Sequence, residues 1–223
     1  MTRSHVPSLL AFYSPFLQAY AANPSPQTLV DGGVNYFNAM SDDGKWLLVS
    51  NDTNSGAWFS DLSLVSTRSP GTPVSVATSA QYDGLPIAPR AYFGGTQRGF
   101  TKDSAYALAE TNLTLNSDNR WIGYLRSMPV APPYTSKLLT NGYMADYFAV
   151  LGSKILVGDN FQDTDGGSSP SIDIDVVDPA SSGGPVNIAR AVPGDTAISS
   201  EMTQVAYSVR SGAAPGIYVS TLP

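Results

Sequence analysis

Acidic residues that could bind a cation are concentrated in one stretch, GDNFQDTDGGSSPSIDIDVVDPA, at residues 158–180. Carboxylate oxygens at short spacing are the ligands that Ca²⁺ prefers, and Asp159, Asp163 and Asp165 are the candidates for such a site. The alternative is that these acids only solvate a turn between two strands. Ligand spacing and the elements that carry the acids distinguish the two.

The run DTDGG has the start of an EF-hand calcium loop but not the rest of it. Such a loop needs oxygen ligands at its first, third, fifth and twelfth positions. Asp163 and Asp165 align with the third and fifth positions. That alignment places Phe161 first and Ile172 twelfth, and neither side chain can bind a cation. The spacing excludes an EF-hand and leaves open a looser calcium site at Asp159, Asp163 and Asp165.

Few other residues could take part in catalysis or metal binding. The chain has no cysteine and one histidine, His5, which excludes disulfides and leaves too few ligands for a zinc site. A Ser-His-Asp triad would depend on His5, and Ser14, Ser50 and Ser208 lack a base partner. Carboxylates could pair as glycosidase acids, but nothing in the sequence indicates which ones would converge. We therefore predict no catalytic residue, no essential metal and no cofactor.

The composition predicts a globular protein built from strands and turns. Of 223 residues, 42% are hydrophobic and 13% are charged, and 20 glycines and 17 prolines supply many turn positions. The net charge of −6, with no run of Lys or Arg, argues against a nucleic-acid-binding surface. No apolar run approaches the roughly 20 residues that a membrane-spanning helix needs.

Four segments repeat one pattern of a polar turn, an apolar strand and a polar exit. They are MSDDGKWLLVSND, FTKDSAYALAETN, VLGSKILVGDN and ISSEMTQVAYSVR. Each is followed by a loop and a second strand, and these strands are GAWFSDLSLV, RWIGYLRSM, SIDIDVVD and PGIYVSTLP. Repeated four-stranded antiparallel units make a β-propeller. The sequence thus predicts an all-β fold, a β-propeller of about five full or partial four-stranded antiparallel blades.

We expect a single β-propeller domain or propeller segment over residues 1–223, with approximate units at 8–33, 34–80, 90–142, 144–192 and 195–223. The acidic residues 159–170 then form the connection between the two central strands of one unit. In the strand that follows, Asp173 and Asp175 alternate with two isoleucines. A period of two places the acids on one face of the strand and the isoleucines on the core face.

The clearest unit, SDDGKWLLVSNDTNSGAWFSDLSLV, resembles the TolB-type, or WD40-like, propeller repeat. That repeat runs Ser-Pro-Asp-Gly-Lys, an apolar strand, a Ser/Asn/Asp/Gly loop and then Ile-Tyr-Val-Xaa-Asp. Its first part is matched by Ser41, Asp43, Gly44 and Lys45, and its second part by SPSIDIDVVDPASSGG and GIYV. The repeat is a signature of fold and specifies no chemistry.

The resemblance implies a non-catalytic binding or scaffold module, similar to the TolB-like propellers of bacterial envelopes, that engages a protein partner through loops on the propeller face. It also implies an extracytoplasmic location, periplasmic or secreted. Two alternatives stay open. One is a detached propeller domain of a larger hydrolase, although the chain has no G-x-S-x-G elbow of its own, and the other is a carbohydrate-binding propeller. No nucleic-acid partner and no membrane span are expected.

The blades at the two ends are expected to be unfinished. Residues 8–33 supply the second to fourth strands of a unit, whereas residues 195–222 supply the first to third, so the two sets cannot merge into one blade. The segment 8–22 belongs to this frame rather than to a signal peptide, whose apolar core would not be interrupted by Pro15. We predict that the outer strand GIYVST is covered by a longer propeller or by a partner chain, including a second copy of this one.

The aromatic residues are expected to pack between blades rather than to form a ligand platform. Tryptophans recur at strand positions, as Trp46, Trp58 and Trp121. Tyrosines share a comparable position in the third strand of their units, as Tyr20, Tyr124 and Tyr218.

Overall fold

The structure is a computed structural model that describes residues 34–51, 61–69, 71–78, 99–115, 121–144, 146–162, 170–210 and 214–223. Every regular element in these ranges is a β-strand. Within the same ranges, no helix is long and apolar enough to span a membrane.

The strands form four antiparallel sheets in chain order, which we call blades 1 to 4. Blade 1 contains β1 (Val34–Met40), β2 (Trp46–Asn51), β3 (Asp61–Ser66) and β4 (Val74–Ala77), and blade 2 contains β5 (Tyr106–Leu115), β6 (Trp121–Pro129) and β7 (Lys137–Leu138). Blade 3 contains β8 (Asp146–Leu151), β9 (Lys154–Gln162), β10 (Ser171–Val177) and β11 (Val186–Ala191), and blade 4 contains β12 (Thr196–Ile198), β13 (Gln204–Val209) and β14 (Gly216–Thr221).

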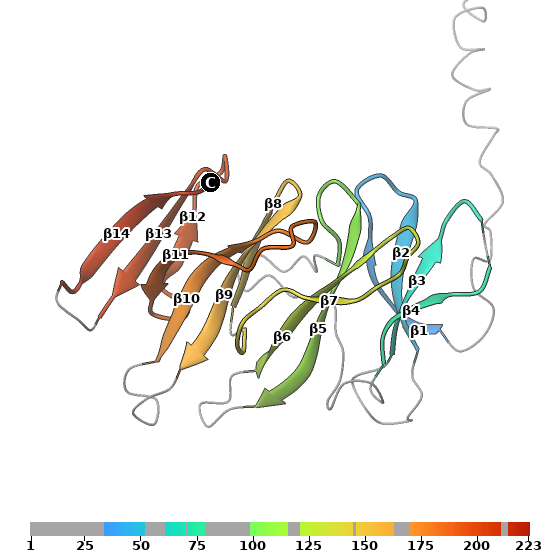
Figure 1. The fold of residues 1–223 in the computed structure, drawn as a ribbon, viewed down its shortest axis with the longest axis horizontal. Helices are drawn as coiled ribbons and strands as arrows, with labels where there is room; N and C mark the ends of the chain where they lie inside the picture. The colour runs from blue at the N-terminus through green and yellow to red at the C-terminus, as the bar shows by residue number, and fades with distance from the viewer. Residues whose placement is uncertain are drawn as a thin grey trace, which may run out of the picture.

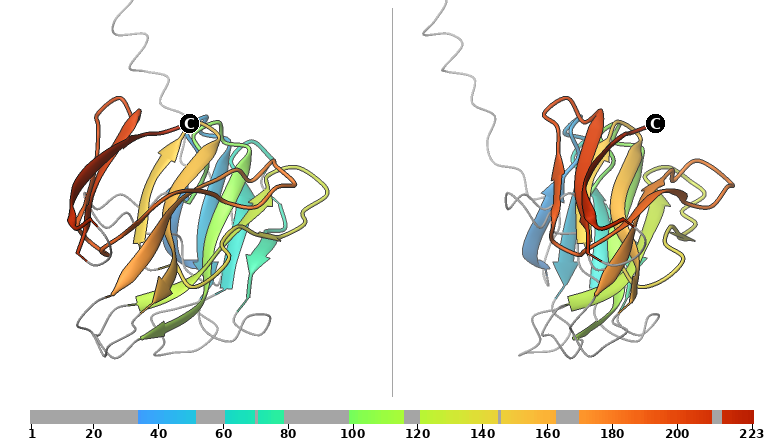
Figure 2. Two further views of the ribbon diagram at one scale, coloured as in Figure 1. Left: turned by 60° about the vertical axis from the view of Figure 1, so that its left-hand side comes forward. Right: turned by 90° about the vertical axis from the view of Figure 1, so that its left-hand side faces the viewer.

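The four blades lie side by side in one row, with blade 1 at one end and blade 4 at the other (Figure 1). The turned views show the same stack obliquely and from its blade 4 end, with the blades one behind another (Figure 2). In each blade the strands are adjacent in the order in which they occur in the sequence.

The prediction of an all-β fold made of repeated antiparallel sheets is confirmed. The unit expected at residues 8–33 lies outside the described residues, as does most of the segment expected to begin the unit at 90–142. The total number of blades and the extent of one domain over residues 1–223 stay predictions.

Apolar side chains on facing sheets form three cores, one at each junction between neighbouring blades. At the first junction, Leu48 and Leu64 lie opposite each other in blade 1 and pack with Ala107 and Met128 of blade 2. The other two junctions are built the same way, from Leu108, Leu125, Ile155 and Val157 and from Ile172, Ile174, Val205 and Leu222. Burying each large aliphatic side chain contributes about 1.5–3 kcal/mol, so these junctions hold the row together.

The turns before β2, β5 and β13 use the same hydrogen bonds in three blades. In blade 1 the Ser41 hydroxyl accepts from the Trp46 amide at 3.0 Å, and the Ser41 carbonyl accepts from the Gly44 amide at 2.9 Å. Thr101 in blade 2 and Ser199 in blade 4 accept in the same two ways. The equivalence of the turns SDDG, TKDS and SSEM, predicted from the sequence, is therefore confirmed.

These turns also connect neighbouring blades. The Asp43 amide donates to the Ser104 hydroxyl at 3.2 Å, from the turn of blade 1 to the turn of blade 2. The Lys102 amide donates to the Gly152 carbonyl at 3.0 Å, from blade 2 to the β8–β9 turn of blade 3. The row of turns thus lies along one side of the stack and fixes the blades in register.

The fourth residue of each of the turns SDDG, TKDS and SSEM has a left-handed backbone, and of these three turns only SDDG has glycine there. The φ angles are 67° at Gly44, 60° at Ser104 and 54° at Met202. An L-residue in this region is strained by about 1 kcal/mol. We therefore expect Gly44→Ala to lower the free energy of unfolding by about 1 kcal/mol and Met202→Gly to raise it by up to about the same amount, as measured by chemical denaturation. A stabilising Gly44→Ala would contradict this account.

Candidate functional site

Three acidic residues of the 158–180 stretch, Asp159, Asp173 and Asp175, lie in strands rather than in a turn. Asp159 lies inside β9, directly opposite Asp173 of β10, and its exposed fraction is 0%. Asp175 lies two residues further along β10 and is 3% exposed. The two-residue period therefore places three carboxyl groups on one face of blade 3, facing blade 2. The assignment of Asp159 to the connecting loop was wrong, because β9 continues to Gln162.

The buried Asp159 carboxylate connects blade 3 to the chain segment that follows β7 of blade 2. It accepts hydrogen bonds from the backbone amides of Asn141 at 2.6 Å and Gly142 at 3.0 Å. A third bond, at 2.6 Å, comes from the amide of Asn160. Charge-assisted bonds of this kind compensate the desolvation of a buried carboxylate. Asp159 is therefore an anchor for the β7–β8 connection.

Asp173 and Asp175 have different surroundings on the same face. Asp173 is partly exposed, accepts from the Asn160 side chain at 2.7 Å, and pairs with Arg190 at 3.3 Å. Asp175 accepts from the Asn187 side chain at 2.8 Å. Burial raises the pKa of Asp175 to about 6, against the Asn187 hydrogen bond and with added repulsion from Asp159 and Asp173.

Asp159, one of the three candidate calcium ligands, already binds backbone amides of the protein. Both oxygens of Asp159 already accept backbone amides, and within the part of the chain that the structure describes no three acidic or histidine side chains form a metal-binding group. Asp163 and Asp165 lie outside the described residues.

We expect thermal melts of the protein with millimolar calcium and with a chelator to agree within about two degrees, because no metal is needed to compensate Asp159. A calcium-dependent rise of several degrees would instead assign a cation to the 159–165 segment. The Asp163→Asn variant is the control, since such a rise would have to disappear in it.

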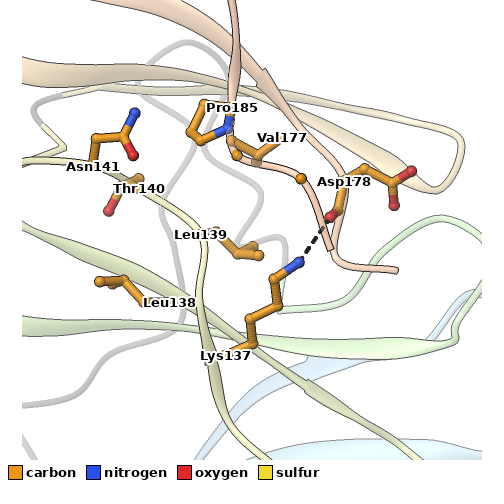
Figure 3. Close-up of a pocket in the computed structure, with 10 residues that line it drawn as sticks. Lys137, Leu138, Leu139, Thr140, Asn141, Val177, Asp178 and Pro185 are labelled. Carbon is orange, nitrogen blue, oxygen red and sulfur yellow. Dashed lines mark hydrogen bonds between the residues drawn. The ribbon is translucent and has the colours of Figure 1, made fainter. Parts of the chain in front are cut away.

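A small cavity of about 170 Å³ lies at the outer part of the junction between blades 2 and 3 (Figure 3). One wall is residues 137–141 and the other is the β10–β11 region, with Val177, Asp178 and Pro185. Ligand pockets usually measure about 300–1,000 Å³. Neither Asp159 nor Asp175 lines this cavity, so these two carboxyl groups do not face a molecule bound in it.

Lys137 closes one side of the cavity by reaching from blade 2 to blade 3 (Figure 3). Its ammonium group donates to the backbone carbonyls of Asp178 at 3.4 Å, Pro179 at 3.3 Å and Ser181. Three donors of an ammonium group are thus matched to three carbonyls of the β10–β11 turn. This lysine is a connection between blades rather than a ligand-binding group.

Sequence reasoning did not find Lys137 or the Asn141–Gly142 amides. An Asn-Gly dipeptide is a strong turn signal, and it could have indicated a bend whose amides need acceptors. No pattern in the sequence distinguished Lys137 from other scattered lysines.

Of the aromatic residues predicted to pack between blades, Trp46 does so, whereas Tyr218 pairs with Tyr207 inside the sheet of blade 4. Trp46 is partly buried against the core between blades 1 and 2. The rings of Tyr124 and Tyr143 lie 4.7 Å apart, and those of Tyr207 and Tyr218 lie 5.9 Å apart. Tyr20 and Trp58 lie outside the described residues, as does the side chain of Trp121.

The large apolar side chains with the highest exposed fractions among the described residues are on β14, at the end of the row (Figure 1). Ile217 is 83% exposed and Val219 is 62% exposed, and the two lie on the same face of the strand. The residue between them, Tyr218, faces the other way and stacks on Tyr207.

The outer edge of β14 also presents backbone groups. The Leu222 amide donates toward β13, to the Thr203 carbonyl at 2.8 Å. Backbone direction alternates along a strand, so Ile217, Val219 and Thr221 direct their N–H and C=O groups away from β13. In the described part of the chain, β14 pairs with β13 alone. We call β14 with these outward groups the open edge.

The fold is similar to that of two solved structures. A putative TolB from Agrobacterium tumefaciens is 16% identical, with a TM-score of 0.44, over 84% of this chain and 59% of that one. TolB from Acinetobacter baumannii is 15% identical, with a TM-score of 0.42, over 87% of this chain and 43% of that one. These likenesses concern the fold alone.

This chain spans about half the length of the two TolB structures. No protein-family model matches the chain, and no curated protein sequence matches it.

Proposed function

We propose that the protein is a non-catalytic binding module that holds a protein partner by strand addition at the open edge of blade 4. The observation that carries the proposal is the open edge itself, where three residues with outward backbone groups coincide with the exposed Ile217 and Val219. An extended segment added there gains main-chain hydrogen bonds from the edge and apolar contacts from one face.

Among the residues that the structure describes, the open edge lacks the features that normally protect outer strands. Such strands are usually short, charged, bulged or covered. In blades 1 and 2 the outer strands β4 and β7 have 4 and 2 residues. In blade 3, β11 carries Arg190, and its pairing with β10 has a register shift. β14 has 6 residues, pairs with β13 without a shift and has no charged side chain.

The rest of the described structure supports binding rather than catalysis. The buried carboxyl groups of Asp159 and Asp175 are occupied by hydrogen bonds within the protein. The cavity at the junction between blades 2 and 3 is smaller than ordinary ligand pockets. The extracytoplasmic location implied by the resemblance to TolB-like propellers is part of this proposal, as is a partner that is a protein rather than a nucleic acid.

Hydrogen exchange of individual backbone amides tests the proposal, with a synthetic peptide of residues 214–223 as the probe strand. The amides of Ile217, Val219 and Thr221 should become protected about tenfold or more, either in the protein alone or with excess peptide. The amides of Tyr218 and Ser220, bonded to β13, are an internal control and should be protected throughout.

Val219→Lys should abolish the protection of the outward amides, because a charge on an edge strand opposes pairing. Val186→Lys is the matched control, since Val186 is also an exposed valine, at 56%, on the outer strand of blade 3. Free exchange of the outward amides in the unmodified protein, both without and with peptide, would overturn the proposal.

A further inference from the structure

The chemistry of the open edge also indicates what kind of strand it takes. We propose that the strand added at the open edge is β14 of a second copy of this chain, paired antiparallel about a two-fold axis at Val219. This inference rests on the proposed function and specifies its partner.

The geometry of β14 is complementary to itself. In an antiparallel pair centred on Val219, that residue lies opposite its own copy, and Ile217 lies opposite Thr221 of the second copy. All three residues direct N–H and C=O groups outward, so each outward group meets a partner. None of the three is proline, and no donor is missing.

Side chains agree with the same pairing. A two-fold axis perpendicular to the sheet keeps the exposed faces of both copies on one side. Val219 then contacts its copy, and Ile217 contacts the Thr221 methyl group of the other chain. β-Branched residues in direct cross-strand contact are favourable pairs. The most exposed apolar side chains of the described structure, Ile217 and Val219, would thereby be covered.

Charge favours this surface as the meeting point of two copies. Each chain has a net charge of −6, so two copies repel each other over most of their surfaces. The strands of blade 4 contain no Asp, Glu, Lys or Arg. Pairing through β14 continues the β13–β14 ladder, so that two three-stranded sheets become one sheet without bringing like charges together.

Two single-cysteine variants test the register directly, because the chain has no cysteine of its own. In the proposed pair, Val219 and its copy have Cα atoms about 5.5 Å apart, inside the range for a disulfide. Thr221 and its copy would be about 13 Å apart, which is too far. Under mild oxidation, Val219→Cys should form a covalent dimer and Thr221→Cys should not.

Light scattering supplies the equilibrium measurement. The protein should have about twice the 23.5 kDa mass of one chain at high micromolar concentration. Val219→Lys should raise the dissociation constant about tenfold or more, because two lysines would lie opposite each other. Val186→Lys should leave it unchanged, which separates a pairing defect from a general effect of added charge.

Three results would overturn the inference: a monomer at all concentrations, equal cross-linking of the two cysteine variants, or unchanged association in Val219→Lys. A monomer whose outward β14 amides are protected by the 214–223 peptide would reject self-association and leave the proposed function standing. A monomer whose outward amides exchange freely even with the peptide would reject both. Outward amides protected in a monomer without peptide would assign the edge to another segment of the same chain.

Discussion

Replacing Asp159 with asparagine is expected to lower the free energy of unfolding by about 2–3 kcal/mol, the largest loss we expect from a single conservative change in this protein. The carboxylate is 0% exposed and accepts the amides of Asn141, Gly142 and Asn160. An asparagine side chain has one acceptor oxygen, so its NH₂ group would face a backbone N–H. One buried donor would then lose its partner, while relief of repulsion from nearby acids offsets part of the loss.

Asp173→Asn is the matched control, because Asp173 lies directly opposite Asp159 on the same face. Its carboxylate is partly exposed and paired with an exposed Arg190, so the loss should stay below about 1 kcal/mol. Urea denaturation followed by far-UV circular dichroism gives both values. Equal effects of the two substitutions would show that the bond between blades 2 and 3 does not depend on Asp159.

Exchange of the Asn141 and Gly142 amides separates a local effect from a general one. In Asp159→Asn these two amides should lose protection before the rest of blade 3 does. Uniform loss across all blades would mean that the variant is only globally less stable.

Asp175→Asn is expected to change the free energy of unfolding in the opposite direction and to stabilise the protein above pH 6. Burial is the main reason that the pKa of Asp175 is raised to about 6 from 3.8. The unfolded chain therefore loses this proton at lower pH than the folded protein does. Stability falls as pH rises from about 4 to about 6 and then stays lower by about 1–3 kcal/mol. The amide, which is neutral at every pH, avoids this loss.

The carbonyl oxygen of the new amide can still accept from Asn187, which now donates to Asp175 at 2.8 Å. The measurement is the difference in unfolding free energy between Asp175→Asn and the unmodified protein at several pH values. We expect that difference to be near zero below pH 4 and to reach about 1–3 kcal/mol by pH 7. A difference that is constant with pH, or a destabilised variant at pH 7, would contradict a raised pKa for this group.

The two substitutions test one arrangement from opposite sides. Asp159 accepts three backbone amides, whereas Asp175 accepts the Asn187 side chain, and burial raises the pKa of Asp175. Asp159 and Asp175 lie on neighbouring strands and on the same face of blade 3. Their expected effects on stability therefore differ because of their hydrogen-bond partners rather than because of their position in the strand.

Much of the fold followed from local sequence alone. Apolar alternation located the strands from Tyr106 to Pro129 and from Lys154 to Ala191, because residues two apart share one face of a strand. Turn residues such as Asp43 and Gly44 located the strand ends, because their side-chain bonds and positive φ are local properties. The repetition of these signals was enough to predict antiparallel blades, and the TolB-like expectation came from the resemblance of one unit to a known repeat.

The candidate site could not be predicted from local sequence, because its properties depend on which residues lie opposite each side chain. Sequence placed Asp159 in an acidic loop, but the end of β9 and the approach of Asn141 and Gly142 made it a buried anchor. The same sequence pattern GIYV that identified β14 as a strand could not show which backbone groups point outward or that Ile217 would be exposed. Burial and backbone pairing are set by contacts between segments far apart in the chain, and only the tertiary structure brings those segments together.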